Sequence, residues 1–145
     1  MLKEALAPFY SKTISPFAIA VSGGGDSMAL LHALRNAPKL HCALIVDHGL
    51  RKASADEAKL TKRRVEALGI TAQILSWKPG DLKSGLQEKA RKARYNLMGD
   101  FCRSKKIPLL LTAHHQDDQA ETLVMRYDNG TYWRGAAGMS PEKYA

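Results

Sequence analysis

The sequence has no apolar run long enough to cross a membrane. Its longest such stretch, IPLLLTA around Leu110, is far shorter than the roughly 20 residues that a membrane-spanning helix requires. The N-terminal segment MLKEALAPFY carries Glu4 and a proline where a signal peptide needs a continuous apolar stretch. We therefore expect neither secretion nor a membrane partner.

Cysteine is scarce as well. The two cysteines, Cys42 and Cys102, are separated by 60 positions, and no C-x-x-C pair is present. This argues against a disulfide framework and against a cysteine-rich metal site. We expect both thiols to be reduced and packed in the core. A reducing compartment fits this pattern, either the cytoplasm or, alternatively, an organellar matrix.

Acidic residues are outnumbered by basic ones, 14 to 22, which gives a formal net charge of +8. The excess lies in the middle of the chain, where residues 51–106 contain 15 Lys or Arg and 6 Asp or Glu. Such a concentration of charge predicts a polyanionic partner such as nucleic acid. Alternatively, these side chains only solvate helix faces.

The chain does contain four apolar runs of strand length, which alternate with helical patterns. The first of them, FAIAV, is a continuous apolar run, as in a strand that is buried on both faces. The runs comprise residues 17–21, 41–46, 71–77 and 107–113, and helical spacing is found in 26–37, 54–68, 85–105 and 116–126. This alternation predicts an α/β fold with a mainly parallel, twisted sheet and helices on both faces.

Two of the expected helices carry additional signals. In residues 54–68, Ser54 followed by Glu57 forms a capping-box pattern, and Gly69 marks the end of the helix. In the basic helix 85–105, one apolar stripe is expected to face the core. That stripe comprises Leu86, Ala90, Ala93, Leu97 and Phe101.

Three polar clusters follow predicted strands: SGGGDS after the first, DHGLR after the second and HHQDDQAET after the fourth. Ligands of parallel α/β folds bind beyond the C-terminal ends of the strands. Because all three clusters fall at this edge, the sequence predicts a ligand site there.

The first cluster, residues 22–27, has the composition of a phosphate-binding loop. Consecutive glycines let backbone N–H groups approach an anion, and the helix that begins near Asp26 directs further N–H groups to the same point. Ser22 and Ser27 add hydroxyl donors. The loop lacks the lysine of a Walker A motif, and Met28 occupies the third glycine position of G-x-G-x-x-G. Alternatively, the segment is a tight turn in which Asp26 is the helix N-cap.

Carboxylates in the first and third clusters indicate a cation. A carboxylate beside a phosphate is repulsive unless a cation mediates, so the natural role of Asp26 is to help hold Mg²⁺. Asp118 and Glu121 are three positions apart on one face of the expected helix 116–126, where they would bind a metal or an ammonium group. Alternatively, these acids lie at a helix N-terminus simply because the helix dipole stabilises negative charge there. His114 and His115 lack the spacing of a zinc site.

The basic helix places Arg91 and Arg94 on a common face, three positions apart. An arginine pair that faces the strand ends would bind phosphate or stabilise charge that develops there. The alternative is a solvated amphipathic helix.

In their order along the chain, SGGGDS, VDHGLR (46–51), QEKARKARY (87–95) and LLTAHHQDDQAET (110–122) resemble the tRNA(Ile)-lysidine synthetase family. SGGxDS alone is typical of the wider PP-loop, N-type ATP pyrophosphatase superfamily, whereas the other segments make the resemblance more specific. It covers residues 15–126 and implies a Rossmann-like fold of the adenine nucleotide alpha hydrolase type.

The resemblance implies an ATP-dependent carbon–nitrogen ligase. Such enzymes use ATP and Mg²⁺ to adenylate C2 of the wobble cytidine, position 34, of a minor isoleucine tRNA with the anticodon CAU, and they release pyrophosphate. The amine of free L-lysine then displaces AMP and leaves lysidine.

By matching motif positions, the resemblance implies a role for each of several residues of this chain. The pyrophosphate loop would comprise Ser22, Gly23, Gly24, Gly25, Asp26 and Ser27. Val46, Asp47 and His48 would lie beside the adenosine. The reaction chamber would be lined by Asp26, Arg91, Arg94, Asp118 and Glu121, with Asp26 and Asp118 as metal ligands.

The chain departs from the family pattern in residues 126–139, where RYDNGTYWRGAAGM replaces a segment richer in small residues. Family members also continue into C-terminal domains that hold tRNA. The resemblance therefore implies that residues 1–145 are a PP-loop ATP pyrophosphatase domain truncated at its C-terminal end. The alternatives are another PP-loop adenylating enzyme, either a tRNA thiolase or a small-molecule amide ligase, and a non-catalytic nucleotide- or RNA-binding remnant.

Overall fold

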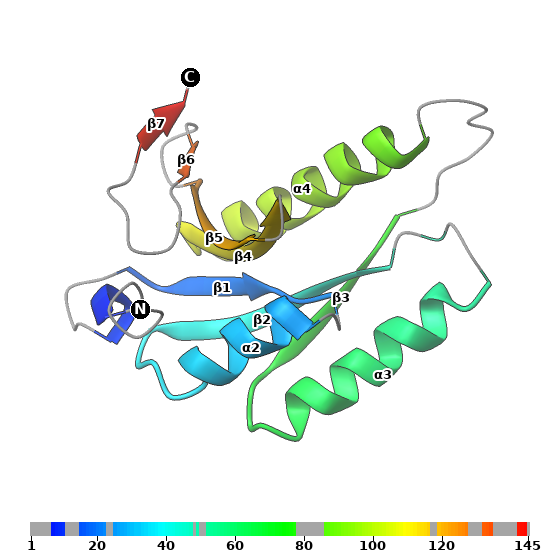
Figure 1. The fold of residues 1–145 in the computed structure, drawn as a ribbon, viewed down its shortest axis with the longest axis horizontal. Coiled ribbons are helices and arrows are strands. Elements are labelled where there is room, and N and C mark those ends of the chain that lie inside the picture. Colours follow the sequence, from blue (N-terminus) through cyan, green and yellow to red (C-terminus); the bar gives the residue numbers. More distant parts are fainter. Residues whose placement is uncertain are drawn as a thin grey trace.

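A computed structural model describes most of the chain and shows a mainly parallel α/β sheet (Figure 1). The described residues are 7–10, 15–22, 25–47, 49, 52–77, 86–116, 119–127, 132–134 and 142–144. In chain order, their elements are the 3₁₀ helix η1 (Ala7–Tyr10), β1 (Phe17–Ala20), α2 (Gly25–Leu34), β2 (Leu40–Asp47), α3 (Ser54–Glu66), β3 (Ala72–Ser76), α4 (Leu86–Ser104), β4 (Leu109–Gln116), β5 (Gln119–Arg126), β6 (Tyr132–Arg134) and β7 (Glu142–Tyr144).

The main sheet has the strand order β3-β2-β1-β4-β5. Strands β1 to β4 are parallel to one another, and β5 runs antiparallel to β4. Strands β6 and β7 pair separately as an antiparallel two-stranded sheet. The predicted fold class, a mainly parallel sheet with helices on both faces, is confirmed.

Two apolar clusters, one on each face of the sheet, explain why the central strand β1 is continuously apolar. In β1, Phe17 and Ile19 belong to the cluster beneath α2 and α3, whereas Ala18 belongs to the cluster beneath α4. Successive side chains of a strand point to opposite faces, so every position of a doubly covered strand is buried. The four strands expected from continuous apolar runs are all present, with ends shifted by up to three residues.

The helices divide between the two faces according to the direction of the chain. Leu31 of α2 and Val65 of α3 pack in one cluster, and Met98 of α4 packs in the other. From β1 to β3 the chain moves one way across the sheet, and from β3 to β4 it moves back. Right-handed crossovers in opposite directions place their helices on opposite faces, as Figure 1 shows.

Helix α3 agrees closely with the expected segment. It begins at Ser54, but Ala53 is the N-cap residue, so Ser54 is the first helical residue and not the cap. The backbone N–H of Gly69 donates to the carbonyl of Glu66 (2.9 Å), and Gly69 has a φ of +82°, a conformation that glycine adopts without strain. The predicted glycine end of this helix is therefore confirmed.

The buried stripe of α4 differs from the expected one. Met98 and Cys102 are 1% and 0% exposed, and Tyr95 packs against the same cluster, whereas Ala93 and Leu97 are only partly buried. Phe101 packs against this cluster from its margin, and the side chains of Leu86 and Ala90 lie outside the described part. Tyr95, Met98 and Cys102 follow the same helical spacing as the predicted stripe, so periodicity alone could not separate two neighbouring stripes.

The expected helix 116–126 is wrong, because residues 119–126 form strand β5. Val124 packs in the cluster beneath α2 and α3, and the adjacent Met125 packs in the cluster beneath α4. This two-residue period is that of a strand. A short apolar run has no decisive periodicity, and pairing with β4 lets both faces of this one be buried.

The end of β5 is anchored on α4 by a close contact at Gly99. A Cβ atom at this position would lie 2.8 Å from Cε1 of Tyr127. The guanidinium carbon of Arg103 lies 5.2 Å from the centroid of the same ring, and the N–H of Tyr127 donates to the carbonyl of Pro108 (2.8 Å). Glycine is thus required here by space, since the ring occupies the volume of a side chain.

We predict that Gly99→Ala lowers the free energy of unfolding by about 1 kcal/mol or more, because overpacking a filled site costs about 1–3 kcal/mol. In a Tyr127→Ala background the same substitution should be neutral or stabilising, since alanine favours a helix over glycine by about 1 kcal/mol. Urea denaturation of the four proteins measures both effects. Asn96→Ala, at an exposed position of α4, is the control for helix propensity. Equal effects of Gly99→Ala in both backgrounds would contradict the contact.

Candidate functional site

The direction of the chain reverses between β1 and β4, which are neighbours in the sheet. From β1 the chain crosses to β2 on one side, whereas β4 is reached from β3 across the other face. Such a reversal leaves room beyond the C-terminal ends of the two strands, where α/β proteins bind ligands. The glycine-rich segment follows β1 directly, and His114 and His115 are among the last three residues of β4. Two of the predicted clusters therefore meet at this reversal.

The loop after β1 is closed by two serines. The backbone N–H of Ser22 donates to Oγ of Ser27 (3.1 Å), and the two hydroxyl oxygens are 3.3 Å apart. Ser27 is only 6% exposed. One predicted ligand donor, Ser27, thus also joins the end of the strand to the first turn of α2.

Helix α2 begins at Gly25, so its N-terminal N–H groups point toward the end of β1, as the phosphate-loop hypothesis expects. Asp26 is the second residue of the helix, which disfavours the alternative that Asp26 is the N-cap preceding it. The side chain of Asp26 lies outside the described part, as do Gly23 and Gly24. Their predicted roles stay predictions.

The end of β2 is shaped by Asp47. Its carboxylate Oδ1 accepts the N–H of Gly49 (3.1 Å), and its carbonyl accepts the N–H of Trp77 at the end of β3 (2.9 Å). Gly49 has a φ of +65°, which glycine adopts readily. Val46 packs against the cluster beneath α4, and His48 lies outside the described residues. Asp47 is therefore a turn-forming residue at the edge where the sequence predicts the adenosine.

Arg94 lies on the buried side of α4, four residues before Met98. Its guanidinium carbon is 5.1 Å from the ring centroid of Tyr95, and its terminal nitrogen donates to the Tyr95 hydroxyl at 3.5 Å. Sequence reasoning missed Tyr95, although it ends the segment QEKARKARY. Arg91 is on the same side of α4 by spacing, but its side chain is outside the described part.

The acidic cluster after β4 does not have the predicted helical geometry. Glu121 belongs to β5, where it pairs with His114 of β4, and Asp118 lies outside the described residues. The expected i, i+3 pair on a helix face is therefore wrong, and so is the alternative that these acids serve a helix dipole. The parallel pairing of β1 with β4 ends at Ala20 and Thr112, and His114 follows Thr112 by two residues in β4.

The whole chain, residues 1–145, matches the family described as the PP-loop domain. The chain belongs to the PP-loop domain family. Its glycine-rich segment 22–27, which the sequence predicts to be the PP-loop, begins just after β1 and ends in the first turn of α2.

Curated relatives of this PP-loop domain are tRNA(Ile)-lysidine synthases. That of Ruegeria pomeroyi is 41% identical over 99% of this chain and 35% of its own length. That of Novosphingobium aromaticivorans is 48% identical over 83% of this chain and 37% of its own length. That of Wolbachia pipientis is 41% identical over 94% of this chain and 32% of its own length. The chain thus spans about a third of the length of these relatives.

A solved structure shares the fold of this PP-loop domain. It is the U34-tRNA thiolase NcsA from Methanococcus maripaludis with its [4Fe-4S] cluster, with a TM-score of 0.66 and 18% identity. The match covers 81% of this chain and 46% of that chain. At this identity the likeness concerns the fold alone.

Both cysteines of the PP-loop domain are buried and free, as predicted. Burial raises the pKa of the Cys42 thiol to about 11 and that of the Cys102 thiol to about 12. A thiol reacts through its thiolate, so both groups are inert near neutral pH. In the part of the chain that the structure describes, no three His, Cys, Asp or Glu side chains converge as a metal site would require.

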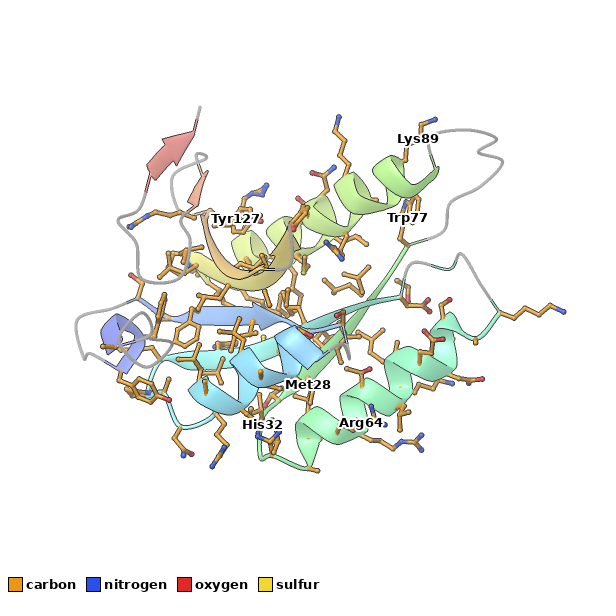
Figure 2. All side chains as sticks on the ribbon, in the orientation of Figure 1. Met28, His32, Arg64, Trp77, Lys89 and Tyr127 are labelled. Carbon is orange, nitrogen blue, oxygen red and sulfur yellow. The ribbon has the colours of Figure 1, made fainter. Side chains whose placement is uncertain are left out.

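The basic middle segment does not form a single surface. Arg64 is exposed on α3 and Lys89 is exposed on α4, and these helices lie on opposite sides of the sheet (Figure 2). The first turns of α4 lie at the C-terminal edge of the sheet with the PP-loop, whereas the last turn of α3 leads to the start of β3 at the opposite edge. Among the described helices, none is long and apolar enough to cross a membrane.

We predict that Ser27→Ala lowers the free energy of unfolding by about 1–2 kcal/mol, because the Ser22 N–H would lose a buried acceptor. Ser104→Ala is the matched control, since the Ser104 hydroxyl also bonds to backbone (2.8 Å to the Phe101 carbonyl) but is exposed. Chemical denaturation compares the two variants. Equal decreases in stability would mean that the Ser22–Ser27 hydrogen bond does not hold the PP-loop.

Proposed function

We propose that this PP-loop domain is the adenylating part of a tRNA(Ile)-lysidine synthase. ATP would adenylate C2 of the wobble cytidine of a minor isoleucine tRNA with the anticodon CAU, and pyrophosphate would leave. The amine of L-lysine would then attack C2, AMP would leave, and lysidine would result. The observation that carries the proposal is the position of the PP-loop at the sheet reversal, together with 41–48% identity to three such synthases.

The chain's own residues suit the binding of a triphosphate. The N–H groups at the start of α2 would donate to the departing pyrophosphate, and the Ser22–Ser27 hydrogen bond holds the loop that presents them. Arg94, and Arg91 on the same side of α4, would bind the phosphate oxygens. Asp47 would shape the turn beside the adenosine.

Carboxylates of the site suit Mg²⁺, a hard cation that prefers oxygen ligands. Asp26, in the first turn of α2, and Asp118, next to β4, would hold it, and Glu121 would receive the ammonium group of lysine. When bound, Mg²⁺ neutralises the charge that develops on the phosphates. The buried thiols disfavour a thiolase that works through cysteine, because neither Cys42 nor Cys102 presents a thiolate.

We predict that the protein transfers labelled lysine into the anticodon loop of the tRNA in an ATP-dependent way, and that Asp26→Ala abolishes the transfer. Without the Asp26 carboxylate, Mg²⁺ would be held less tightly, and the negative charge of the phosphates would not be neutralised. Asp56→Ala is the control, since Asp56 is an exposed acid of α3. Because the chain spans about a third of the length of its relatives, the assay is run on this chain and on a longer form. The proposal is overturned if neither form transfers labelled lysine into the tRNA.

A second prediction concerns the tRNA surface. Neutralising Lys89 and Lys92, which are exposed in the first turns of α4, should reduce the slope of log affinity against log salt by about one unit for each lysine that binds a phosphate. Neutralising Lys62, Arg63 and Arg64 on α3 should leave that slope unchanged, because this part of α3 lies toward the opposite edge of the sheet. Titration of tRNA binding at several salt concentrations measures both. A larger change in the α3 variant would assign the tRNA to the other face.

A further inference from the structure

Arg94 carries a buried nitrogen without a hydrogen bond. Its Nε atom is inaccessible to solvent and has no partner within the described part of the chain. A buried polar group of this kind is rare in proteins, and a charged one is especially unfavourable. The arginine therefore has an unused donor on the buried side of α4.

Tyr95 restricts where this guanidinium can lie. Its ring centroid is 5.1 Å from the guanidinium carbon, within the range of a cation–π contact, and its hydroxyl accepts from the terminal nitrogen at 3.5 Å. The ring is itself fixed, because Tyr95 packs against the apolar cluster beneath α4. These two contacts with the fixed Tyr95 side chain thus limit the rotamers of the long, flexible Arg94 side chain.

The contact between Arg94 and Tyr95 lies midway along α4, whose first turns are at the C-terminal edge of the sheet. Tyr95 shares its cluster with Ala20, Val46 and Leu75, which are at or next to the C-terminal ends of β1, β2 and β3. Ala20 is two residues before Ser22, where the PP-loop begins. Farther along α4, Met98 and Cys102 cover the interior of the sheet instead. Arg94 thus lies in the half of α4 that begins at the ligand edge of the sheet.

We propose that Tyr95 is a positioning residue, which holds Arg94 so that its Nε–H and terminal N–H groups donate to an oxyanion of bound ATP. This inference rests on the proposed function, which supplies the triphosphate. An oxyanion satisfies the unused donor and matches the planar, forked geometry of a guanidinium. Because Tyr95 fixes the arginine before the nucleotide arrives, less rotamer freedom is lost on binding.

A double-mutant cycle tests the coupling. ATP affinity is measured by calorimetry for the wild-type chain, Arg94→Ala, Tyr95→Leu and the double variant. Arg94→Ala should weaken binding about tenfold or more, the usual effect of removing a hydrogen bond to a charged group. Tyr95→Leu should weaken it at least about threefold, in line with the removal of a cation–π interaction. In the Arg94→Ala background, Tyr95→Leu should have no further effect, because there is no guanidinium left to position.

Two further variants distinguish a role of Tyr95 in positioning Arg94 from a role in packing alone. Phe101→Leu also shortens an aromatic side chain of α4 that packs on the same cluster, but it is seven residues from Arg94. It should lower the midpoint of thermal unfolding as Tyr95→Leu does and leave ATP affinity unchanged. Tyr95→Phe keeps the ring and should retain most of the affinity. Additive effects of Arg94→Ala and Tyr95→Leu, or equal ATP affinities of Tyr95→Leu and Phe101→Leu, would overturn the proposal.

Inorganic pyrophosphate, used as a second probe, distinguishes this inference from the proposed function. If the chain binds pyrophosphate but not ATP, the proposed function fails, and the same cycle with pyrophosphate decides the role of Tyr95. If Arg94→Ala leaves both affinities unchanged, Arg94 does not bind the phosphates and the inference fails. If the chain binds neither ATP nor pyrophosphate, both the proposed function and this inference are overturned.

Discussion

The candidate site depends on the way the chain crosses the sheet on either side of β1. Because right-handed crossovers are strongly favoured, a chain that moves from β1 to β3 and then returns to β4 must place α2 and α3 on one face and α4 on the other. The same reversal separates the connections that leave β1 and enter β4. Ligand-binding segments can therefore gather at that point without displacing any part of the core.

Helix α4 shows how one element serves the core and the site together. Its C-terminal half carries Met98 and Cys102 into the apolar cluster and leaves space at Gly99 for Tyr127. Its N-terminal half begins at the ligand edge, and Arg94 lies beside Tyr95 midway along the helix. Packing that stabilises the sheet thus also determines where the arginine lies. The exposed lysines of α4 are on the remaining surface, away from the core.

Much of the fold could be predicted from local pattern, since four of the expected strands and three of the expected helices occur where predicted. The wrong prediction of a helix at residues 119–126 has a definite cause. TLVM is compatible with either a helix or a strand, and only the free edge of β4 favours the strand. The stripe on α4 differs for a similar reason, because two adjacent stripes have nearly equal apolar character and contact with the sheet selects one of them.

The sequence by itself predicted which residue types form a phosphate site, since the polar segment from Ser22 to Ser27 directly follows a strand-like run. It also determined that the two thiols are core residues, because isolated cysteines among apolar neighbours pack as small hydrophobic groups. Only the tertiary structure decided that Ser27 closes its own loop, that Tyr95 holds Arg94, and that the basic residues of α3 and α4 face opposite ways. These are relations between side chains brought together by strand pairing and helix packing, and no local pattern encodes them.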